Sequence, residues 1–275
     1  MIATASMRSA RINNHPAVSA GFIEVPPAAG PRILSPSQAT QFLDCPAQWY
    51  FKHELRLPDP PTGSLALGRA VHAAIAAAAR AKLARATCTT LQLLALYHEL
   101  AASEFSAAEL RDDEDQAALQ SDGARLVELY LQQALPSIQP ARIEHAITSP
   151  IAGVHVRAIV DLVDVAGQVI ELKTSSRRPA GISAAHALQT TTYAMLEQSD
   201  HAQIHTLVRT KTPQLIRHTL ELTPEMRRYA QTIYPLVAES MATGLYPPHR
   251  ASIFCSRNNC AFWRNCEEEY GGHIQ

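Results

Sequence analysis

Three cysteines stand close together near the end of the chain, at positions 255, 260 and 266, and a fourth, Cys45, lies 210 residues before the first of them. With 5 Cys in 275 residues, a window of this length should hold only about 0.2 by chance. Thiolates at such spacing can bind a soft metal ion or an iron–sulfur cluster. Because the four ligands come from both ends of the chain, they would join the two ends into one closed body.

A second set of chemical groups lies in the middle of the chain, at Asp161, Glu171 and Lys173. Residues 154–165 and 168–174 alternate and are rich in Val and Ile, so they predict two strands, and the short turn between them predicts a hairpin. Asp161 and Glu171 would then meet at the open end of the hairpin, and Glu171 and Lys173 would project from one face. Two carboxylates suit Mg²⁺ or Mn²⁺, and a lysine beside them could orient a water or stabilise phosphate charge.

Glu-x-Lys is common by chance, and carboxylates on hairpins are usually solvated. The apolar residues that precede and interrupt this motif, Val169, Ile170 and Leu172, favour a chemical role because they predict a buried strand. Gln189 and Tyr193 are four residues apart on a predicted helix and so share a face.

His72 lies in Gly68-Arg-Ala-Val-His72 on an otherwise apolar, Ala-rich helix. A single histidine in such a place is more often a hydrogen-bonded core residue than a metal ligand. Both interpretations stay open at this point.

The elements that must position these residues follow a simple order. Ser35-Pro36-Ser37-Gln38 predicts a helix N-terminus with a capping box, and this helix carries Cys45. Further helices are predicted over 65–86, 89–110, 114–135, 183–197 and 224–244, and further strands over 142–149, 203–210 and 214–221. Helices, then a sheet, then helices indicate one α/β body with a helical N-terminal part.

Composition limits the class of protein. The net charge of −1 excludes a polycation, so any nucleic-acid surface must be a local patch. No stretch is long and apolar enough to predict a membrane span, and no secretory signal is visible. We therefore expect no membrane partner and a reducing cytoplasm, where clustered cysteines favour metal over disulfides.

Residues 1–31 are rich in Pro and small residues and predict a disordered leader, although two arginines and few acids also allow a transit peptide. We expect residues 32–275 to form a single domain. Its parts are a mostly helical segment (32–140), a catalytic sheet and helix (141–222), and a C-terminal helix with the cysteine cluster (223–275).

The ordered set of motifs resembles the PD-(D/E)XK nuclease superfamily, in particular its RecB-like branch with a four-cysteine iron–sulfur cluster. That branch includes nuclease domains of bacterial helicase–nucleases and nucleases of CRISPR adaptation, and the ending Cys-Glu-Glu-Glu-Tyr-Gly-Gly is similar to phage-borne members. The similar segments are Phe42…Cys45-Pro46…Trp49, Gly68-x3-His72, Ala158-Ile-Val-Asp161, Glu171-Leu-Lys173-Thr174, Gln189-x3-Tyr193 and the closing cysteines. Two departures are Ala158 in place of the usual Gly, and the four residues between Cys255 and Cys260 instead of two.

The resemblance implies a restriction-endonuclease-like mixed central sheet flanked by helices, with the termini joined by a [4Fe–4S] cluster on Cys45, Cys255, Cys260 and Cys266. It implies a Mg²⁺- or Mn²⁺-dependent deoxyribonuclease, an exonuclease acting on DNA ends or single strands in recombination, repair or phage DNA processing. A helicase or recombinase partner is implied as well.

The resemblance also implies roles for individual residues. The metal ligands would be His72, Asp161, Glu171 and the Leu172 carbonyl. Lys173 would assist the attacking water, and Gln189 and Tyr193 would support the centre or contact DNA. DNA-contacting cations are sought among Arg69, Arg177, Arg178, Arg209 and Lys211.

Two alternatives remain. The chain could be a catalytically silent iron–sulfur subunit that binds DNA or supports assembly, although the complete set of His, Asp, Glu and Lys favours an enzyme. Zinc could replace the cluster, but structural zinc sites favour shorter spacing within cysteine pairs. Cys88 stands alone in the sequence and is expected to take no part.

Overall fold

A five-stranded mixed sheet forms the centre of the structure, a computed structural model that describes residues 32–275. The strands lie in the order β1-β2-β3-β4-β5, with the bounds Pro140–Ile151, Val154–Asp164, Val169–Ser175, His201–Val208 and Gln214–Glu221. The pair β3 and β4 is parallel and the other neighbours are antiparallel. A parallel pair needs a crossover, which α6 (Ala184–Leu196) provides. The expected mixed central sheet flanked by helices is confirmed.

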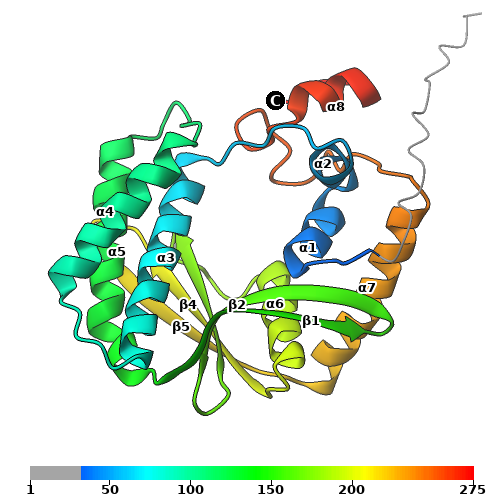
Figure 1. The fold of residues 1–275 in the computed structure, drawn as a ribbon. Helices are drawn as coiled ribbons and strands as arrows, with labels where there is room; N and C mark the ends of the chain where they lie inside the picture. Colours follow the sequence, from blue (N-terminus) through cyan, green and yellow to red (C-terminus); the bar gives the residue numbers. More distant parts are fainter. Residues whose placement is uncertain (1–31) are drawn as a thin grey trace, which may run out of the picture.

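Helices cover both faces of the sheet (Figure 1). On one face lie α3 (Gly63–Leu83), α4 (Thr90–Ser106) and α5 (Gln116–Gln133), followed by the short η2 (Leu135–Ser137). On the other lie α1 (Pro36–Asp44), α6 and α7 (Pro224–Ala242). Successive strand residues point to opposite faces, so β2 supplies Leu162 to the first layer's core and the adjacent Val163 to the second.

The alanines of α3 explain how the first layer packs so closely. Ala66, Ala70, Ala74 and Ala78 recur every four residues and are all buried. This spacing places them on one face of the helix, and their small side chains allow α4 and α5 to approach. Burial of this face, more than helix propensity, stabilises the layer.

The N-terminal helix differs from its prediction at Cys45. The capping box of Ser35 and Gln38 is present, but α1 ends at Asp44 and Cys45 is extended, with φ −152° and ψ 102°. A new helix, α2 (Pro46–Trp49), then begins and continues into the π-helical turn η1 (Tyr50–Glu54). Pro46 causes the break, because a residue before proline is driven out of the helical region.

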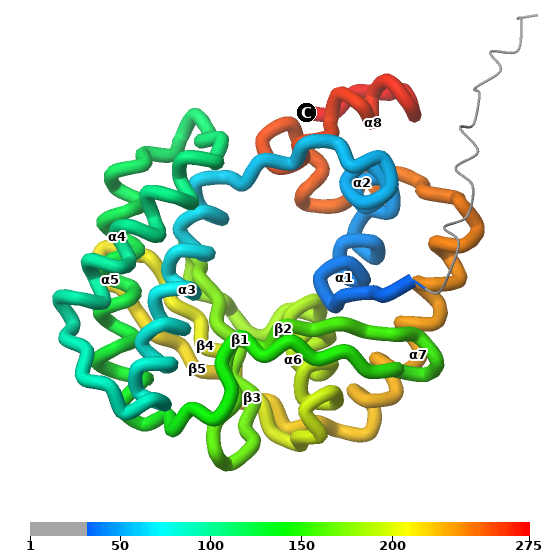
Figure 2. Tube along the Cα trace, viewed as in Figure 1, coloured from blue at the N-terminus to red at the C-terminus, as the bar shows by residue number. Residues whose placement is uncertain are grey.

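The segment from the end of α1 through η1 and the C-terminal segment after α7 lie side by side (Figures 1 and 2). Tyr246, after α7, stacks on Tyr50 with ring centroids 4.7 Å apart, and Phe262 lies 5.9 Å from Phe51. The Ser252 hydroxyl donates to both carboxylate oxygens of Asp44 at 3.0 Å. Protein contacts therefore join the ends directly, and the last helix, α8 (Trp263–Tyr270), which was not predicted, belongs to this junction.

The predicted leader, residues 1–31, lies outside the described residues. Within residues 32–275 no helix combines the length and the apolar character that a membrane crossing requires.

Candidate active site

The hairpin of β2 and β3 brings Asp161 and Glu171 together. Leu162 pairs with Ile170, so the next positions toward the open end are Asp161 and Glu171. The Leu172 N–H donates to Asp161 Oδ2 at 2.7 Å, and the two carboxyl groups are close enough to share a hydrogen bond. The predicted meeting of these two side chains is therefore observed.

The pKa values of the two carboxyl groups are shifted in opposite directions. Burial, and then the neighbouring Asp161 carboxylate, raise the pKa of Glu171 to about 8 against the opposing charge of Lys173. Burial also acts to raise the pKa of Asp161, but the hydrogen bond and charge of His72 and the Leu172 N–H lower it below its usual range. At neutral pH the pair therefore carries one proton, as expected for two carboxylates that cannot both ionise.

Lys173 lies between the carboxylate pair and α6. Its ammonium donates to Glu171 Oε1 at 2.7 Å and to Gln189 Oε1 at 2.9 Å, and the Gln189 amide in turn donates to the Tyr193 hydroxyl at 2.8 Å. A lysine ammonium has three donors, so one N–H remains that no described residue accepts. The predicted grouping of Lys173, Gln189 and Tyr193 is thus a single hydrogen-bonded chain.

His72 reaches the same centre from α3. Its Nδ1 lies 3.5 Å from Asp161 Oδ1, and its side chain is 28% exposed, so it is not buried in the core. Gly68, one turn earlier, allows this approach because a Cβ there would lie 3.0 Å from Thr174 Oγ1. The Gly-x3-His spacing therefore keeps α3 close to β3 and directs the imidazole toward Asp161.

The metal-binding capacity of this centre can be tested on its donor atoms. Within residues 32–275, no three His, Cys, Asp or Glu side chains are gathered tightly enough to hold one ion. However, Glu171 is only 3% exposed, and its Oε2 is buried with no described partner. The proton that the pair holds at neutral pH can join Glu171 to Asp161, and a bound divalent cation would take the place of that proton. The residues therefore fit a hard divalent cation. That the Leu172 carbonyl is a ligand stays a prediction.

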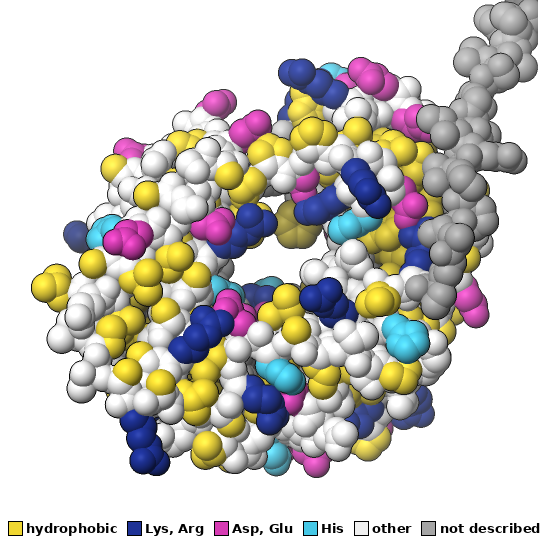
Figure 3. Space-filling view, viewed as in Figure 1, with side chains coloured by type: hydrophobic (Ala, Val, Ile, Leu, Met, Phe, Trp, Pro, Cys, Tyr) yellow, Lys and Arg dark blue, Asp and Glu magenta, His cyan; other side chains and the backbone are white. Residues whose placement is uncertain are grey.

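A cleft lies beside the centre, between α3, α4 and the sheet. His72, Gly68, Lys173 and Thr174 line it together with Ser64, Leu65, Arg69, Ala73, Glu104 and Glu144. The space-filling view is hollowed at its middle, with Lys and Arg side chains around the opening (Figure 3).

The predicted DNA-contacting cations lie on and around this cleft. Arg69 lines it and is 3.6 Å from Glu104, and Arg209 donates to the Ser64 hydroxyl at 3.2 Å. Arg177, Arg178 and Lys211 lie on the loops that follow β3 and β4. The carboxyl ends of parallel strands share one edge of a sheet, so these loops are neighbours.

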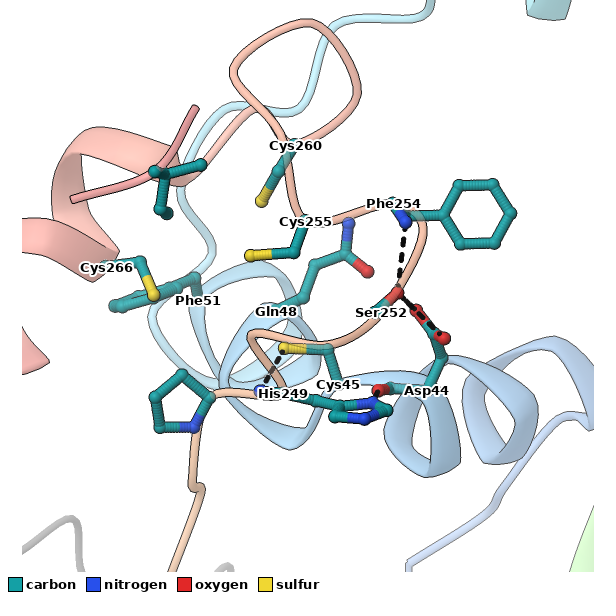
Figure 4. Close-up of a pocket in the computed structure, with 12 residues that line it drawn as sticks. Asp44, Cys45, Gln48, Phe51, His249, Ser252, Phe254, Cys255, Cys260 and Cys266 are labelled. Atoms are coloured by element: carbon teal, nitrogen blue, oxygen red, sulfur yellow. Dashed lines mark hydrogen bonds between the residues drawn. The ribbon is translucent and has the colours of Figure 1, made fainter. Parts of the chain in front are cut away.

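The four cysteines line one pocket about 370 Å³ in empty volume, part of which is open to solvent (Figure 4). The main-chain N–H of His249 donates to Cys45 Sγ at 3.4 Å. None of the five cysteines forms a disulfide, and Cys88 is exposed on the connection between α3 and α4. The structure therefore brings together the four cysteines that the sequence grouped, and their role as cluster ligands stays a prediction.

The surroundings of this pocket favour a negatively charged occupant. Burial raises the pKa of the Cys266 thiol to about 11, and Arg250 opposes this shift. Arg250 donates through one nitrogen to the carbonyls of Cys266 and Gly271, whereas its other terminal nitrogen is buried with no described partner. A guanidinium with one buried, unpartnered nitrogen near Cys266 fits a thiolate-ligated metal centre, which carries net negative charge.

Two residues near these sites were missed from the sequence. Nothing in the sequence pattern marks Arg250 as a site residue except its position near the cysteines. His186 lies three residues before Gln189, and this helical spacing could have placed it on the face of Gln189 and Tyr193.

Comparisons with known proteins agree with this geometry. A search of curated proteins found no match. Among solved structures, a protein from Eubacterium rectale described as a "putative exonuclease" matches with a TM-score of 0.56 and 11% identity, over 85% of this chain and 87% of that chain. The match to the structure of SSO0001 covers 84% of this chain and 96% of that chain at 15% identity, but the TM-score of 0.36 is too low to support a shared fold. The model of the PD-(D/E)XK nuclease superfamily matches residues 33–267. The chain therefore belongs to the PD-(D/E)XK nuclease superfamily.

Proposed function

We propose that the protein is a metal-dependent deoxyribonuclease that hydrolyses phosphodiester bonds at DNA ends or in single strands. One observation carries the proposal: the buried Glu171 carboxyl meets the Asp161 carboxylate beside a lysine with a free donor. Without a bound cation the two carboxyl groups cannot both ionise, so one of them holds a proton at neutral pH.

Asp161 and Glu171, with His72 and the Leu172 carbonyl, would hold Mg²⁺ or Mn²⁺. The bound ion supplies Lewis-acid polarisation of the phosphate and a water of lowered pKa. Lys173 then has two partners that fix its position, Glu171 Oε1 and Gln189 Oε1. Its third N–H can orient the attacking water or stabilise the charge that develops on the phosphate.

Gln189 and Tyr193 would act as supports for this lysine. The Tyr193 hydroxyl is buried and accepts the Gln189 amide N–H, so it fixes which end of that amide faces Lys173. This arrangement gives the lysine a single geometry, as preorganised charge stabilisation requires. Contact of either residue with DNA is compatible with the same positions.

The substrate class is supported by the cleft and its cations. Arg69 and Arg209 lie at the cleft, and Arg177, Arg178 and Lys211 lie on the neighbouring loops. Phosphate contacts of this kind position DNA without reading its sequence. The hollow at the middle of the molecule (Figure 3) suits a single strand or an end, and the similar Eubacterium rectale protein is described as a "putative exonuclease". A helicase or recombinase partner would supply such strands.

The four cysteines would hold a [4Fe–4S] cluster. Structural zinc sites favour two to four residues between paired cysteines, whereas five separate Cys260 from Cys266 and Cys45 is remote in sequence. This spacing favours iron–sulfur over zinc.

The test is a cleavage assay on end-labelled single- and double-stranded DNA with Mg²⁺, Mn²⁺ or EDTA. We expect metal-dependent release of short products by the wild-type protein and no cleavage by Lys173→Ala. Lys52→Ala is the matched control, because Lys52 is an exposed lysine that pairs with Asp59. Cleavage by Lys173→Ala at the wild-type rate would contradict the mechanism. Complete absence of cleavage by a metal-loaded wild-type protein that binds DNA would favour the silent subunit.

A further inference from the structure

A third polar side chain, His186, shares the face of α6 that carries Gln189 and Tyr193. It lies three residues before Gln189 and seven before Tyr193, a spacing that places all three on one face of a helix. Ser183 caps α6 and its hydroxyl accepts the His186 main-chain N–H at 3.2 Å, so the first turn of the helix is fixed.

The imidazole of His186 is half-buried and has no hydrogen-bond partner among residues 32–275. Burial, and then the charge of Lys173, lower the pKa of His186 to about 4, so the ring lies within range of that ammonium. At neutral pH the imidazole is neutral, with one N–H donor and one acceptor nitrogen. Neither ring nitrogen is among the buried unpartnered atoms of residues 32–275, so both remain open to an incoming ligand.

The side chains around His186 leave it accessible. Its neighbours in the first turn are Ala184, Ala185 and Ala187, and the first two are exposed. Within the first turn of α6, therefore, no long side chain stands between His186 and a polynucleotide backbone. His186 lies about 4.5 Å along the helix axis from Gln189, given a rise of 1.5 Å per residue. It is on the side of Gln189 that faces the N-terminus of α6.

We propose that His186 is a substrate-binding residue that donates its imidazole N–H to an oxygen of the phosphate next to the scissile one. The inference rests on the proposed nuclease function, in which Lys173 faces the scissile phosphate itself. A neutral donor suits this position because it can bind phosphate without adding a second cation beside Lys173. The ring contributes binding and takes no part in proton transfer.

The experiment measures binding separately from cleavage. Full-length wild-type protein, His186→Ala, His186→Gln and His98→Ala are titrated with a fluorescently labelled single-stranded oligonucleotide in EDTA at low salt, and anisotropy gives Kd. Because one hydrogen bond is removed, we expect His186→Ala to raise Kd about threefold to tenfold. His186→Gln keeps an N–H donor and should stay within about twofold of wild type. His98→Ala replaces an exposed histidine of α4 and should change nothing.

Steady-state cleavage with Mn²⁺ should show the same ratio in KM with little change in kcat, and melting temperatures should be equal. An unchanged Kd for His186→Ala, or a Gln variant as weak as the Ala variant, overturns the inference. So does a wild-type protein that does not bind the oligonucleotide. If binding depends on His186 but no variant cleaves DNA, the inference stands and the nuclease proposal fails. If the protein cleaves DNA but His186→Ala leaves Kd unchanged, the nuclease proposal stands and the inference about His186 fails.

Discussion

Replacing Glu171 with Gln should stabilise the metal-free protein while abolishing its activity. The Glu171 carboxyl is buried beside Asp161, and its pKa is raised to about 8. At neutral pH the folded protein therefore holds a proton on this group that the unfolded chain releases. A glutamine keeps the shape, accepts from Lys173 and donates to Asp161 without needing that proton.

The sign and size of the effect follow from proton linkage. A carboxyl whose pKa is raised in the folded state contributes its full stability only below the unfolded pKa of 4.5. As the pH rises above that value the free energy of unfolding falls, and it stops falling once the pH passes about 8. At pH 7 the loss amounts to about 3 kcal/mol for one carboxyl. Glu171→Gln should recover a large part of it, so the free energy of unfolding in EDTA should rise by about 2 to 3 kcal/mol and the difference should vanish near pH 4.

Urea denaturation in EDTA at pH 7 and pH 4.5 measures this difference, and Glu114→Gln is the matched control. The Glu114 carboxylate accepts hydrogen bonds from the N–H groups of Gly63, Ser64 and Arg111 and from the Ser64 hydroxyl, at 2.6–3.2 Å. Burial acts to raise the pKa of Glu114, but these bonds lower it. Its replacement should therefore destabilise the protein by about 1 to 2 kcal/mol, the opposite sign.

Addition of Mn²⁺ completes the test. Mn²⁺ at 100 times its Kd should stabilise the wild-type protein by about 2.7 kcal/mol, and Glu171→Gln should gain far less. If Glu171→Gln is less stable than wild type in EDTA at pH 7, the carboxylate is an ordinary structural ion-pair partner of Lys173. The charge argument for the metal site then fails.

Three further predictions concern other groups. His72→Ala should weaken Mn²⁺ binding about tenfold or more by calorimetry with little change in melting temperature, and an unchanged affinity would exclude a role at the metal. Cys45→Ser should lose iron and visible colour in anaerobically purified protein, whereas Cys88→Ser should keep both; loss from the second variant would contradict the assignment. His205 is buried and its pKa is lowered to about 4, chiefly by burial, so its contribution to stability is present above pH 6.5 and lost as the pH falls toward 4. The free energy of unfolding of His205→Asn should therefore fall by about 3 kcal/mol less than that of the wild-type protein between pH 7 and pH 4. Equal losses in parallel urea titrations would contradict this prediction.

Much of the fold could be predicted because its signals are local. The alternating apolar residues of β2 and β3 and the capping box at Ser35 depend only on neighbouring residues, and both are observed. The break at Cys45 was present in the sequence as Pro46, but the helical pattern on both sides outweighed it in the prediction. The helix α8 could not be predicted, because its three consecutive glutamates carry little apolar pattern and it depends on contact with the N-terminal helices.

The candidate site was predictable to the extent that its members are close in sequence or on one element. Glu171 and Lys173 share a strand face, and Gln189 and Tyr193 share a helix face, so spacing alone paired them. That Gln189 accepts from Lys173 depends on the crossover of α6, and that His72 faces Asp161 depends on the packing of α3. Spacing cannot specify such contacts between elements, and here the resemblance to a family supplied them.

The cysteine pocket and α6 share one hydrophobic core. The core that packs against Cys45, Cys255 and Cys260 also contains Leu188 and Tyr193 of α6. In contrast, α3, which carries His72, packs in the other core with α4 and α5. Loosening of the joined termini would therefore disturb the Tyr193–Gln189–Lys173 chain before it disturbs His72, because local stability follows cooperative packing units. Through this core, the cysteine site can maintain the position of the catalytic lysine without any direct contact with the active centre.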